Sequence, residues 1–124
     1  MRTVLVDGDN TLWALKKRAH PLAEQFLQQL ELAAVEKDWE VVVVFDGPER
    51  HTRRESGPLV VQYAVGRTAD SVIERLAHDT RDKSGLIVVT QDRAQADLVR
   101  GFGARVWSAE RLQEEMGYND SDEK

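Results

Sequence analysis

Three apolar runs of the sequence, each typical of a buried strand, are followed at once by acidic or amide side chains. These side chains are Asp7, Asn10, Asp46 and Asp92, after the runs 3–6, 41–45 and 86–90. Oxygen atoms of this kind are the ligands that Mg²⁺ prefers. If the strands are parallel, their carboxyl ends meet at one edge of the sheet, where open α/β sheets bind their ligands. The sequence therefore predicts an acidic, metal-binding cleft.

Strand-like and helix-like patterns alternate along the chain. Runs rich in β-branched residues predict strands over 2–7, 40–45, 59–65, 86–90 and 104–107. Helices are predicted over 21–37, from a cap at Thr68, from a capping box at Asp92 and Gln95 to about Arg100, and over 108–116, where Ser108 is the expected cap. Gly8 is expected to allow a sharp turn or a close approach to a ligand. The alternation predicts a three-layer α/β fold, with a parallel sheet of about five strands and helices on both faces.

Length and composition restrict the class of protein. The 124 residues suit one compact domain, and 41% hydrophobic with 31% charged residues is ordinary for a globular protein. The net charge of −5 argues against binding nucleic acid through a global positive field, but bound cations can reverse the sign of an acidic cleft. The absence of cysteine fits a reducing compartment. Because no apolar run is long enough to cross a bilayer and Met1 leads straight into strand material, we expect a cytoplasmic protein with no membrane partner.

Several short motifs, in their order along the chain, resemble the NYN domain in its YacP-like bacterial branch, which belongs to the PIN-like ribonucleases. The motifs are Asp7-Gly8-x-Asn10, Phe45-Asp46, Thr68-Ala69-Asp70-Ser71-x-Ile73-Glu74, Thr90-x-Asp92, Gly101-Phe102-Gly103-Ala104 and Ser108-Ala109-Glu110. The resemblance implies a metal-dependent ribonuclease that hydrolyses phosphodiester bonds of RNA endonucleolytically. It also implies a nuclease domain over 1–117. The polar residues 118–124, after the last predicted helix, are expected to form a flexible tail.

The resemblance further implies a set of site residues. The implied catalytic positions are Asp7, Asn10, Asp46, Asp70 and Asp92, of which Asp7, Asp70 and Asp92 hold Mg²⁺ or Mn²⁺. Two positions depart from the family pattern. Asp9 stands where an uncharged or aromatic residue is usual, and Thr68 stands where glutamate is frequent. The implied partner is RNA, including ribosome-associated mRNA, and the chain is expected to be a monomer or a homodimer.

Each aspartate except Asp7 also has a ready structural interpretation. Asp92 can cap a helix, Asp70 can favour the positive end of its helix dipole, and Asp46 can form an Asx turn. For Asp7, at the end of a strand and before a glycine, we expect no capping role. Asn10 can orient water or phosphate, or it can simply tolerate an unusual turn. Asp97 lies off the helical face of Asp92, so we expect it to be solvated rather than a ligand.

Basic side chains are expected to bind RNA phosphates around the cleft. The candidates are Arg50, Arg53 and Arg54, with His51, in a predicted exposed loop over 49–58, and Arg67 and Arg93 in loops at the same edge. Trp13 can stack on a base, although packing is the favoured role for all three tryptophans.

Two alternatives to the ribonuclease remain. Asp7-x-Asp9-x-Thr11 also resembles the first motif of haloacid-dehalogenase-type phosphatases, with Asp7 as nucleophile and Asp9 as acid/base. However, the only lysine after Thr90 is Lys124, so the lysine of that family is missing from its expected place. The other alternative is a catalytically weak module that keeps the fold and binds RNA or the ribosome.

Overall fold

A six-stranded sheet with the order β3-β4-β2-β1-β5-β6 forms the centre of the molecule in the computed structural model, which describes residues 1–48 and 55–117. The strands are β1 (Arg2–Asp7), β2 (Trp39–Asp46), β3 (Glu55–Ser56), β4 (Leu59–Ala64), β5 (Leu86–Val89) and β6 (Arg105–Trp107). All neighbouring strands are parallel except β3, which pairs antiparallel with β4. The predicted sheet of five parallel strands is therefore confirmed, with β3 as an added edge strand.

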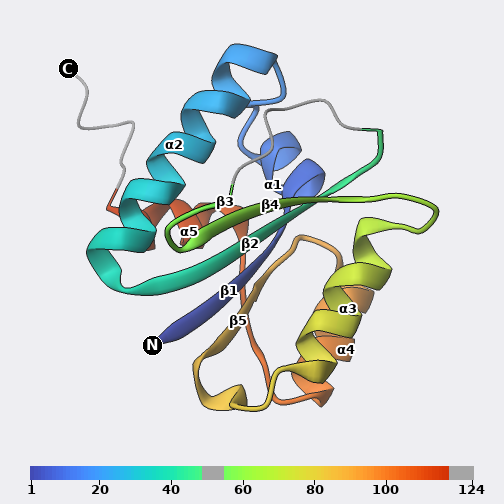
Figure 1. Ribbon diagram of the computed structural model, residues 1–124. Coiled ribbons are helices and arrows are strands. Elements are labelled where there is room, and N and C mark those ends of the chain that lie inside the picture. Colours follow the sequence, from blue (N-terminus) through green and yellow to red (C-terminus); the bar gives the residue numbers. More distant parts are fainter. Residues whose placement is uncertain (49–54, 118–124) are drawn as a thin grey trace.

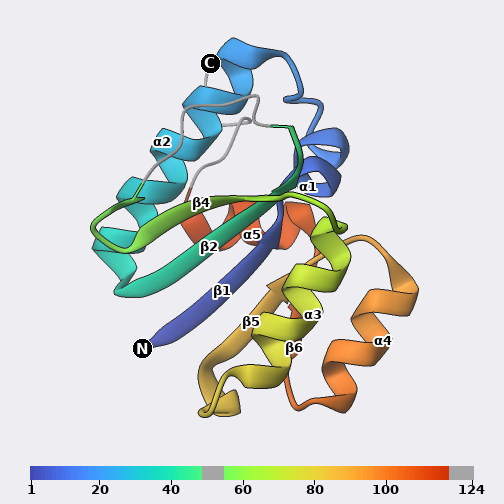
Figure 2. The same ribbon diagram turned by 45° about the vertical axis from the view of Figure 1, so that its right-hand side comes forward.

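Helices cover both faces of this sheet, as Figures 1 and 2 show. They are α1 (Gly8–Ala14), α2 (His20–Lys37), α3 (Ala69–Asp79), α4 (Arg93–Gly101) and α5 (Ala109–Met116), with a 3-10 turn at Lys83–Gly85. One apolar core joins α1, α2 and α5 to the sheet, and a second joins α3 and α4 to the opposite face. The predicted three-layer arrangement is thus confirmed.

Strand β1 lies in the middle of the sheet, between β2 and β5. Its side chains alternate between the two cores: Val4 and Val6 pack on the side of α2, and Leu5 packs on the side of α3. Because both faces are covered, the strand has a continuous apolar sequence rather than an alternating one. This central position brings the end of β1, at Asp7, to the middle of one sheet edge.

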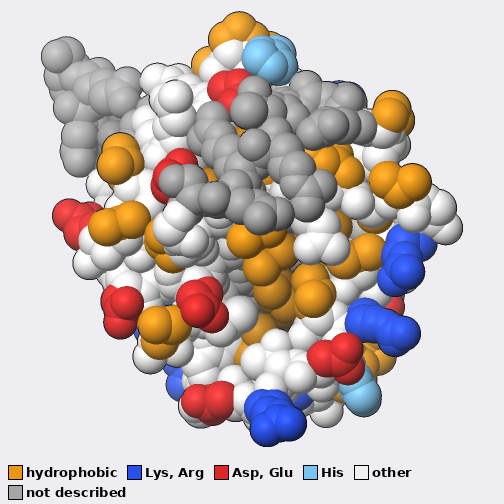
Figure 3. All heavy atoms as spheres, in the orientation of Figure 1, with side chains coloured by type: hydrophobic (Ala, Val, Ile, Leu, Met, Phe, Trp, Pro, Cys, Tyr) orange, Lys and Arg blue, Asp and Glu red, His pale blue; other side chains and the backbone are white. Residues whose placement is uncertain are grey.

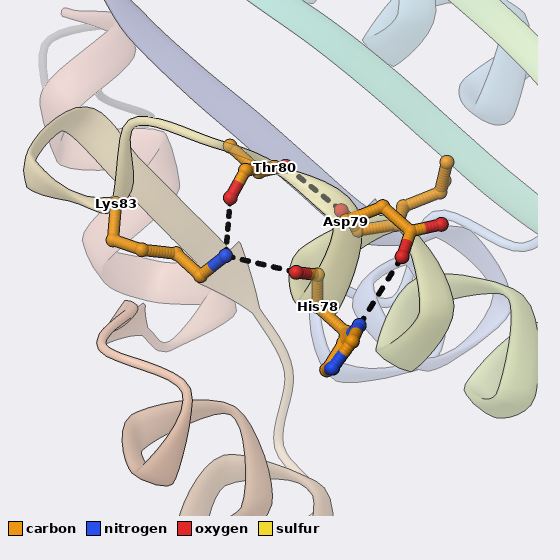
Figure 4. A network of polar contacts seen from close by, with 5 residues as sticks. His78, Asp79, Thr80 and Lys83 are labelled. Carbon is orange, nitrogen blue, oxygen red and sulfur yellow. Dashed lines mark hydrogen bonds and ion pairs between the residues drawn. The ribbon is translucent and has the colours of Figure 1, made fainter.

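Side chains cap the N-termini of α3 and α5, and a lysine side chain binds carbonyls at the C-terminus of α3. Thr68 and Ser108 cap α3 and α5 as predicted, each accepting a backbone hydrogen bond three residues on. At the other end of α3, Lys83 Nζ donates to the backbone carbonyls of His78, at 2.9 Å, and Thr80 (Figure 4). Lysine at this position satisfies carbonyls that the helix itself leaves unpaired.

One helix and one strand were not predicted, nor was the 3-10 turn at Lys83–Gly85. Helix α1 occupies the place of the expected turn, and its N-cap is Asp7, whose carboxylate accepts the Asn10 N–H at 3.4 Å. The expectation that Asp7 has no capping role is therefore wrong. Gly8 is needed for packing rather than for a turn, because a Cβ there would lie 2.5 Å from Phe45 Cε1. Strand β3 falls inside the predicted loop over 49–58.

The described helices include none with the length and apolar character that crossing a bilayer requires. The tail over 118–124, predicted to be flexible, lies outside the described residues.

Candidate active site

The carboxyl edge of the sheet contains a topological switch point between β1 and β5. After β1 the chain crosses to β2 over one face of the sheet, through α1 and α2, whereas after β5 it crosses to β6 over the other face, through α4. Connections that leave neighbouring strands in opposite directions open a crevice between them, which is where doubly wound sheets bind ligands. Asp7 ends β1, and Thr90, Gln91 and Asp92 follow β5 at this point.

Two carboxyl groups from distant parts of the chain are in contact at this edge. Asp7 is only 6% exposed, and its side chain hydrogen-bonds to that of Asp70 in the first turn of α3. Burial raises the pKa of Asp7 from 3.8 to about 7, and the charge and hydrogen bond of Asp70 act in the same direction. The hydrogen bond from the Asn10 N–H opposes them. Without a cation, the pair therefore retains a proton close to neutral pH.

Glu74 and Asp92 add negative charge beside this pair. Burial raises the pKa of Glu74, and the charges of Asp70 and Asp92 raise it further, so the three carboxylates are within electrostatic reach of one another. Glu74 was not among the predicted site residues. Its spacing could have revealed it, because residues four apart on a helix share a face and Glu74 lies four residues after Asp70.

Gln95, on α4, connects these carboxylates. The predicted capping box is only half formed: the Gln95 N–H donates to Asp92 Oδ1 at 3.1 Å, but the Gln95 side chain does not return to the Asp92 backbone. The Asp92 N–H is satisfied by Thr90 Oγ1 instead, also at 3.1 Å. The Gln95 amide reaches Asp70, where Nε2 lies 3.2 Å from Oδ1 and 3.3 Å from the backbone oxygen.

Asp9 and Asp46 fasten the ends of α1, β2 and α3 to one another. Asp9 Oδ2 accepts the Asp46 N–H at 2.8 Å, and Asp46 Oδ1 accepts the Ala69 N–H, also at 2.8 Å. Ala69 directly precedes Asp70. The Asp46 side chain thus lies at the predicted edge and holds the start of the helix that carries Asp70; the described contacts contain no Asx turn at this residue.

Asn10 also has a structural contact within the site. Its Oδ1 accepts the Gln91 N–H at 2.7 Å, and Gln91 Oε1 in turn accepts the Ala109 N–H at 2.7 Å. These bonds connect α1, the loop after β5 and the start of α5. Among the described residues the Asn10 amide nitrogen has no partner, so its two N–H groups remain for a ligand.

Two of the predicted phosphate-binding arginines, Arg67 and Arg93, line separate hollows. Arg67 and Arg75 line a hollow between β4 and α3, and Figure 3 shows basic side chains over α3. Arg93 and Arg100 line a second hollow, which also includes Asp92. Both Arg67 and Arg93 are exposed. The predicted residues Arg50, His51, Arg53 and Arg54 lie outside the described part of the chain.

The remaining predicted residues have other contacts, none of them with Asp7 or Asp70 among those described. Asp97 is exposed and pairs with Arg100 at 3.5 Å, as expected for a solvated position. Trp39 and Trp107 pack edge to face with ring centroids 5.8 Å apart, as predicted. Trp13 is 65% exposed, with the Arg18 guanidinium 4.4 Å from its ring centroid. The packing role favoured for Trp13 is therefore wrong, because α1 turns this side chain away from the core.

The donor set fits a hydrated hard cation rather than a closed protein cage. Among the described residues, no three carboxylate or imidazole side chains converge closely enough to hold an ion by themselves. Mg²⁺ keeps several waters and needs only one or two direct carboxylates together with substrate phosphate. Asp7 and Asp70 provide such a pair, and their mutual repulsion is a penalty that a divalent cation would relieve.

Comparisons with known proteins agree with the fold described above. A family model described as the YacP-like NYN domain matches residues 4–124. The chain is similar to the crystal structure of Rae1 (YacP) from Bacillus subtilis, with 27% identity and a TM-score of 0.77 over 94% of this chain and 74% of that chain. The W164L mutant of the same Bacillus subtilis protein matches with 27% identity and a TM-score of 0.75, over 94% of this chain and 76% of that chain. No significant match was found among curated proteins.

Proposed function

The chain belongs to the YacP-like NYN domain family, and on that premise we propose that it is a metal-dependent endoribonuclease that hydrolyses phosphodiester bonds of RNA. Members of the NYN family are generally nucleases. The fold supports the proposal because the candidate site lies at the switch point of the sheet, where this architecture binds its ligands.

The contact between the Asp7 and Asp70 carboxyl groups is the observation that carries the proposal. Burial and the neighbouring Asp70 make ionisation of Asp7 unfavourable in the folded chain, and a bound cation would relieve that penalty. A protein that only needed to fold would gain by replacing one of the two aspartates with an uncharged residue. The pair is therefore best explained as a binding site for Mg²⁺ or Mn²⁺. Asp92, the third predicted ligand, does not converge with the pair closely enough to complete a three-carboxylate site among the described residues, so we propose that Asp92 and Glu74 act by adding negative charge.

Different residues have different roles in the proposed hydrolysis. A bound divalent ion supplies an activated water and stabilises the charge that develops on the phosphate. Asp7 and Asp70 hold that ion, and Asp46 keeps Asp70 in place through the start of α3. The Asn10 amide nitrogen is available to donate to a phosphate oxygen or to the attacking water.

Arginines at the edges of the site bind the RNA backbone in this proposal. Arg67 lines a hollow beside α3, and Arg93 lines a hollow that includes Asp92. The proposal also assigns phosphate binding to Arg50, Arg53 and Arg54, which lie outside the described residues. Since the net charge is −5, binding depends on these local cations and on the bound metal rather than on a global field. The proposed substrate is RNA, including ribosome-associated mRNA, and the protein is proposed to act in the cytoplasm as a monomer or homodimer.

The phosphatase alternative has no support from the geometry. Its acid/base would be Asp9, but Asp9 Oδ2 accepts the Asp46 N–H at 2.8 Å and so fastens β2 to α1. The phosphatase alternative also leaves the contact of Asp7 with Asp70 unexplained.

The test is incubation of the purified protein with labelled single-stranded RNA, with and without Mn²⁺, beside two variants. Asp7→Asn removes a proposed ligand, and Asp97→Asn makes the same change at an exposed aspartate. We expect Mn²⁺-dependent internal cleavage by the wild type and by Asp97→Asn, and none by Asp7→Asn. Cleavage that survives in Asp7→Asn would contradict the proposal. Turnover of a phosphomonoester instead would indicate a phosphatase, and neither activity in the wild type would indicate a binding module.

A further inference from the structure

A buried amide contacts the acidic group without satisfying its own hydrogen-bonding capacity. Gln95 is 2% exposed, and its Nε2 donates to two oxygens of Asp70, the carboxylate Oδ1 and the backbone carbonyl. The same side chain is close enough to Glu74 to stabilise that carboxylate. Gln95 Oε1 is buried and has no hydrogen-bond partner within the described residues.

The orientation of this amide follows from its neighbours. Both atoms of Asp70 that face it are acceptors, so the NH₂ group must point toward them; the reversed amide would place oxygen against oxygen. This orientation leaves Gln95 Oε1 unpaired, and a buried polar atom without a hydrogen-bond partner destabilises the fold. A buried atom of this kind in a native protein requires an explanation, and function is a frequent one.

We propose that Gln95 is a positioning residue, which holds the Asp70 carboxylate against Asp7 so that the two can bind a divalent cation together. The inference rests on the proposed metal-dependent function and names a residue that acts through Asp70. Because Gln95 is neutral, it orients Asp70 without adding another negative charge to the group. Its own backbone is fixed in turn, since its N–H donates to Asp92 Oδ1. One residue therefore connects α4 and its N-cap with the first turn of α3.

This inference predicts that metal affinity and stability respond differently to one substitution. Gln95→Met keeps an unbranched side chain of similar length but removes both the donor and the unpaired oxygen. Outer-shell partners of metal ligands typically contribute 10–100-fold to metal affinity. We therefore expect Gln95→Met to raise the dissociation constant for Mn²⁺ about 10–100-fold, while the urea midpoint in EDTA does not fall.

Gln113→Met is the matched control. Gln113 lies on α5, on the opposite face of the sheet, and its Nε2 is also buried and unpaired among the described residues. The substitution therefore makes the same chemical change at a half-buried position, away from the carboxylates of Asp7, Asp70 and Glu74. We expect Mn²⁺ affinity within about twofold of the wild type for this variant.

The experiment is calorimetric titration of each metal-free protein with Mn²⁺ at pH 7.5, together with urea unfolding in EDTA. A wild type that binds Mn²⁺ and a Gln95→Met variant that binds it equally well would overturn the role of Gln95, while the proposed function would stand. Lower stability with unchanged affinity would mean a merely structural glutamine and would overturn it as well. A wild type that neither binds Mn²⁺ nor cleaves RNA would overturn the function and the role of Gln95 together.

If Gln95→Met does not fold, Gln95→Asn provides the same test. It keeps the amide on a side chain one methylene shorter, which withdraws the donor from Asp70. Its Mn²⁺ affinity should also fall at least tenfold, and unchanged affinity would contradict the proposal.

Discussion

Replacing Asp7 by asparagine should stabilise the metal-free protein at neutral pH, although it removes a proposed catalytic group. Burial and the contact with Asp70 raise the pKa of Asp7 from 3.8 to about 7 in the folded state. Below pH 3.8 the Asp7 carboxyl is protonated in both the folded and the unfolded chain, so its burial does not lower the free energy of unfolding. Between pH 3.8 and 7 unfolding releases a proton, and the free energy of unfolding therefore falls as the pH rises.

The size of this effect follows from the difference between the two pKa values. Each unit of pKa difference corresponds to 1.36 kcal/mol. Ionisation of Asp7 therefore lowers the free energy of unfolding by about 4 kcal/mol compared with the protonated form. Asparagine carries no charge, but it replaces the O–H that a protonated Asp7 offers to Asp70 with an amide of different geometry. We therefore expect its advantage over aspartate to grow by about 2–4 kcal/mol between pH 4 and pH 7.5.

The assay is urea unfolding in EDTA across this pH range, for the wild type, Asp7→Asn and Asp97→Asn. Titrations elsewhere in the chain cancel when the variant is compared with the wild type at each pH. Addition of Mn²⁺ at pH 7.5 should reverse the order, because a cation that binds only the folded wild type stabilises it by mass action. A stability difference that is the same at every pH would show that Asp7 is not buried against Asp70 as described.

Three other substitutions test separate parts of the site. Gly8→Ala should lower the free energy of unfolding by about 1–3 kcal/mol in urea, because its Cβ would overlap the ring of Phe45; an unchanged midpoint would contradict this packing. Asp92→Asn should abolish Mn²⁺-dependent cleavage but keep the N-cap of α4. Asp92→Ala should abolish cleavage and also lower the free energy of unfolding by about 1 kcal/mol. Equal stability of the two variants would mean that the cap contributes nothing. Arg67→Ala in the inactive Asp7→Asn background should reduce the salt dependence of single-stranded RNA binding by about 0.7 in the logarithmic slope, and an unchanged slope would exclude a phosphate contact.

The parts of the fold that depend on local signals could be predicted from the sequence. The buried strands, the caps at Thr68 and Ser108 and the parallel arrangement all follow from patterns within a few residues. Helix α1 could not be predicted, because seven residues are too few to display a clear helical period. Strand β3 has only two residues and exists through its pairing with β4, which is a contact that local propensity does not encode.

The candidate site was predicted in outline only. Parallel topology alone gathers Asp7, Asp46 and Asp92 at one edge, and the structure agrees. The direct contact of Asp7 with Asp70 depends on how α3 lies across the end of β1, and the role of Gln95 depends on the packing of α3 against α4. Both are properties of tertiary packing, which no spacing along the chain reveals.

The attachment of α3 at both ends has a thermodynamic consequence for loading the cation. Asp46 accepts the N–H at the start of this helix, and Lys83 donates to carbonyls at its end, so the helix cannot slide along its axis without breaking bonds at both ends. The backbone would therefore already be arranged for the proposed ion, and what would change on loading is the protonation of Asp7, whose pKa of about 7 would fall beside a cation. Calorimetry in two buffers with different ionisation enthalpies should accordingly report different apparent heats, since the displaced proton is taken up by the buffer.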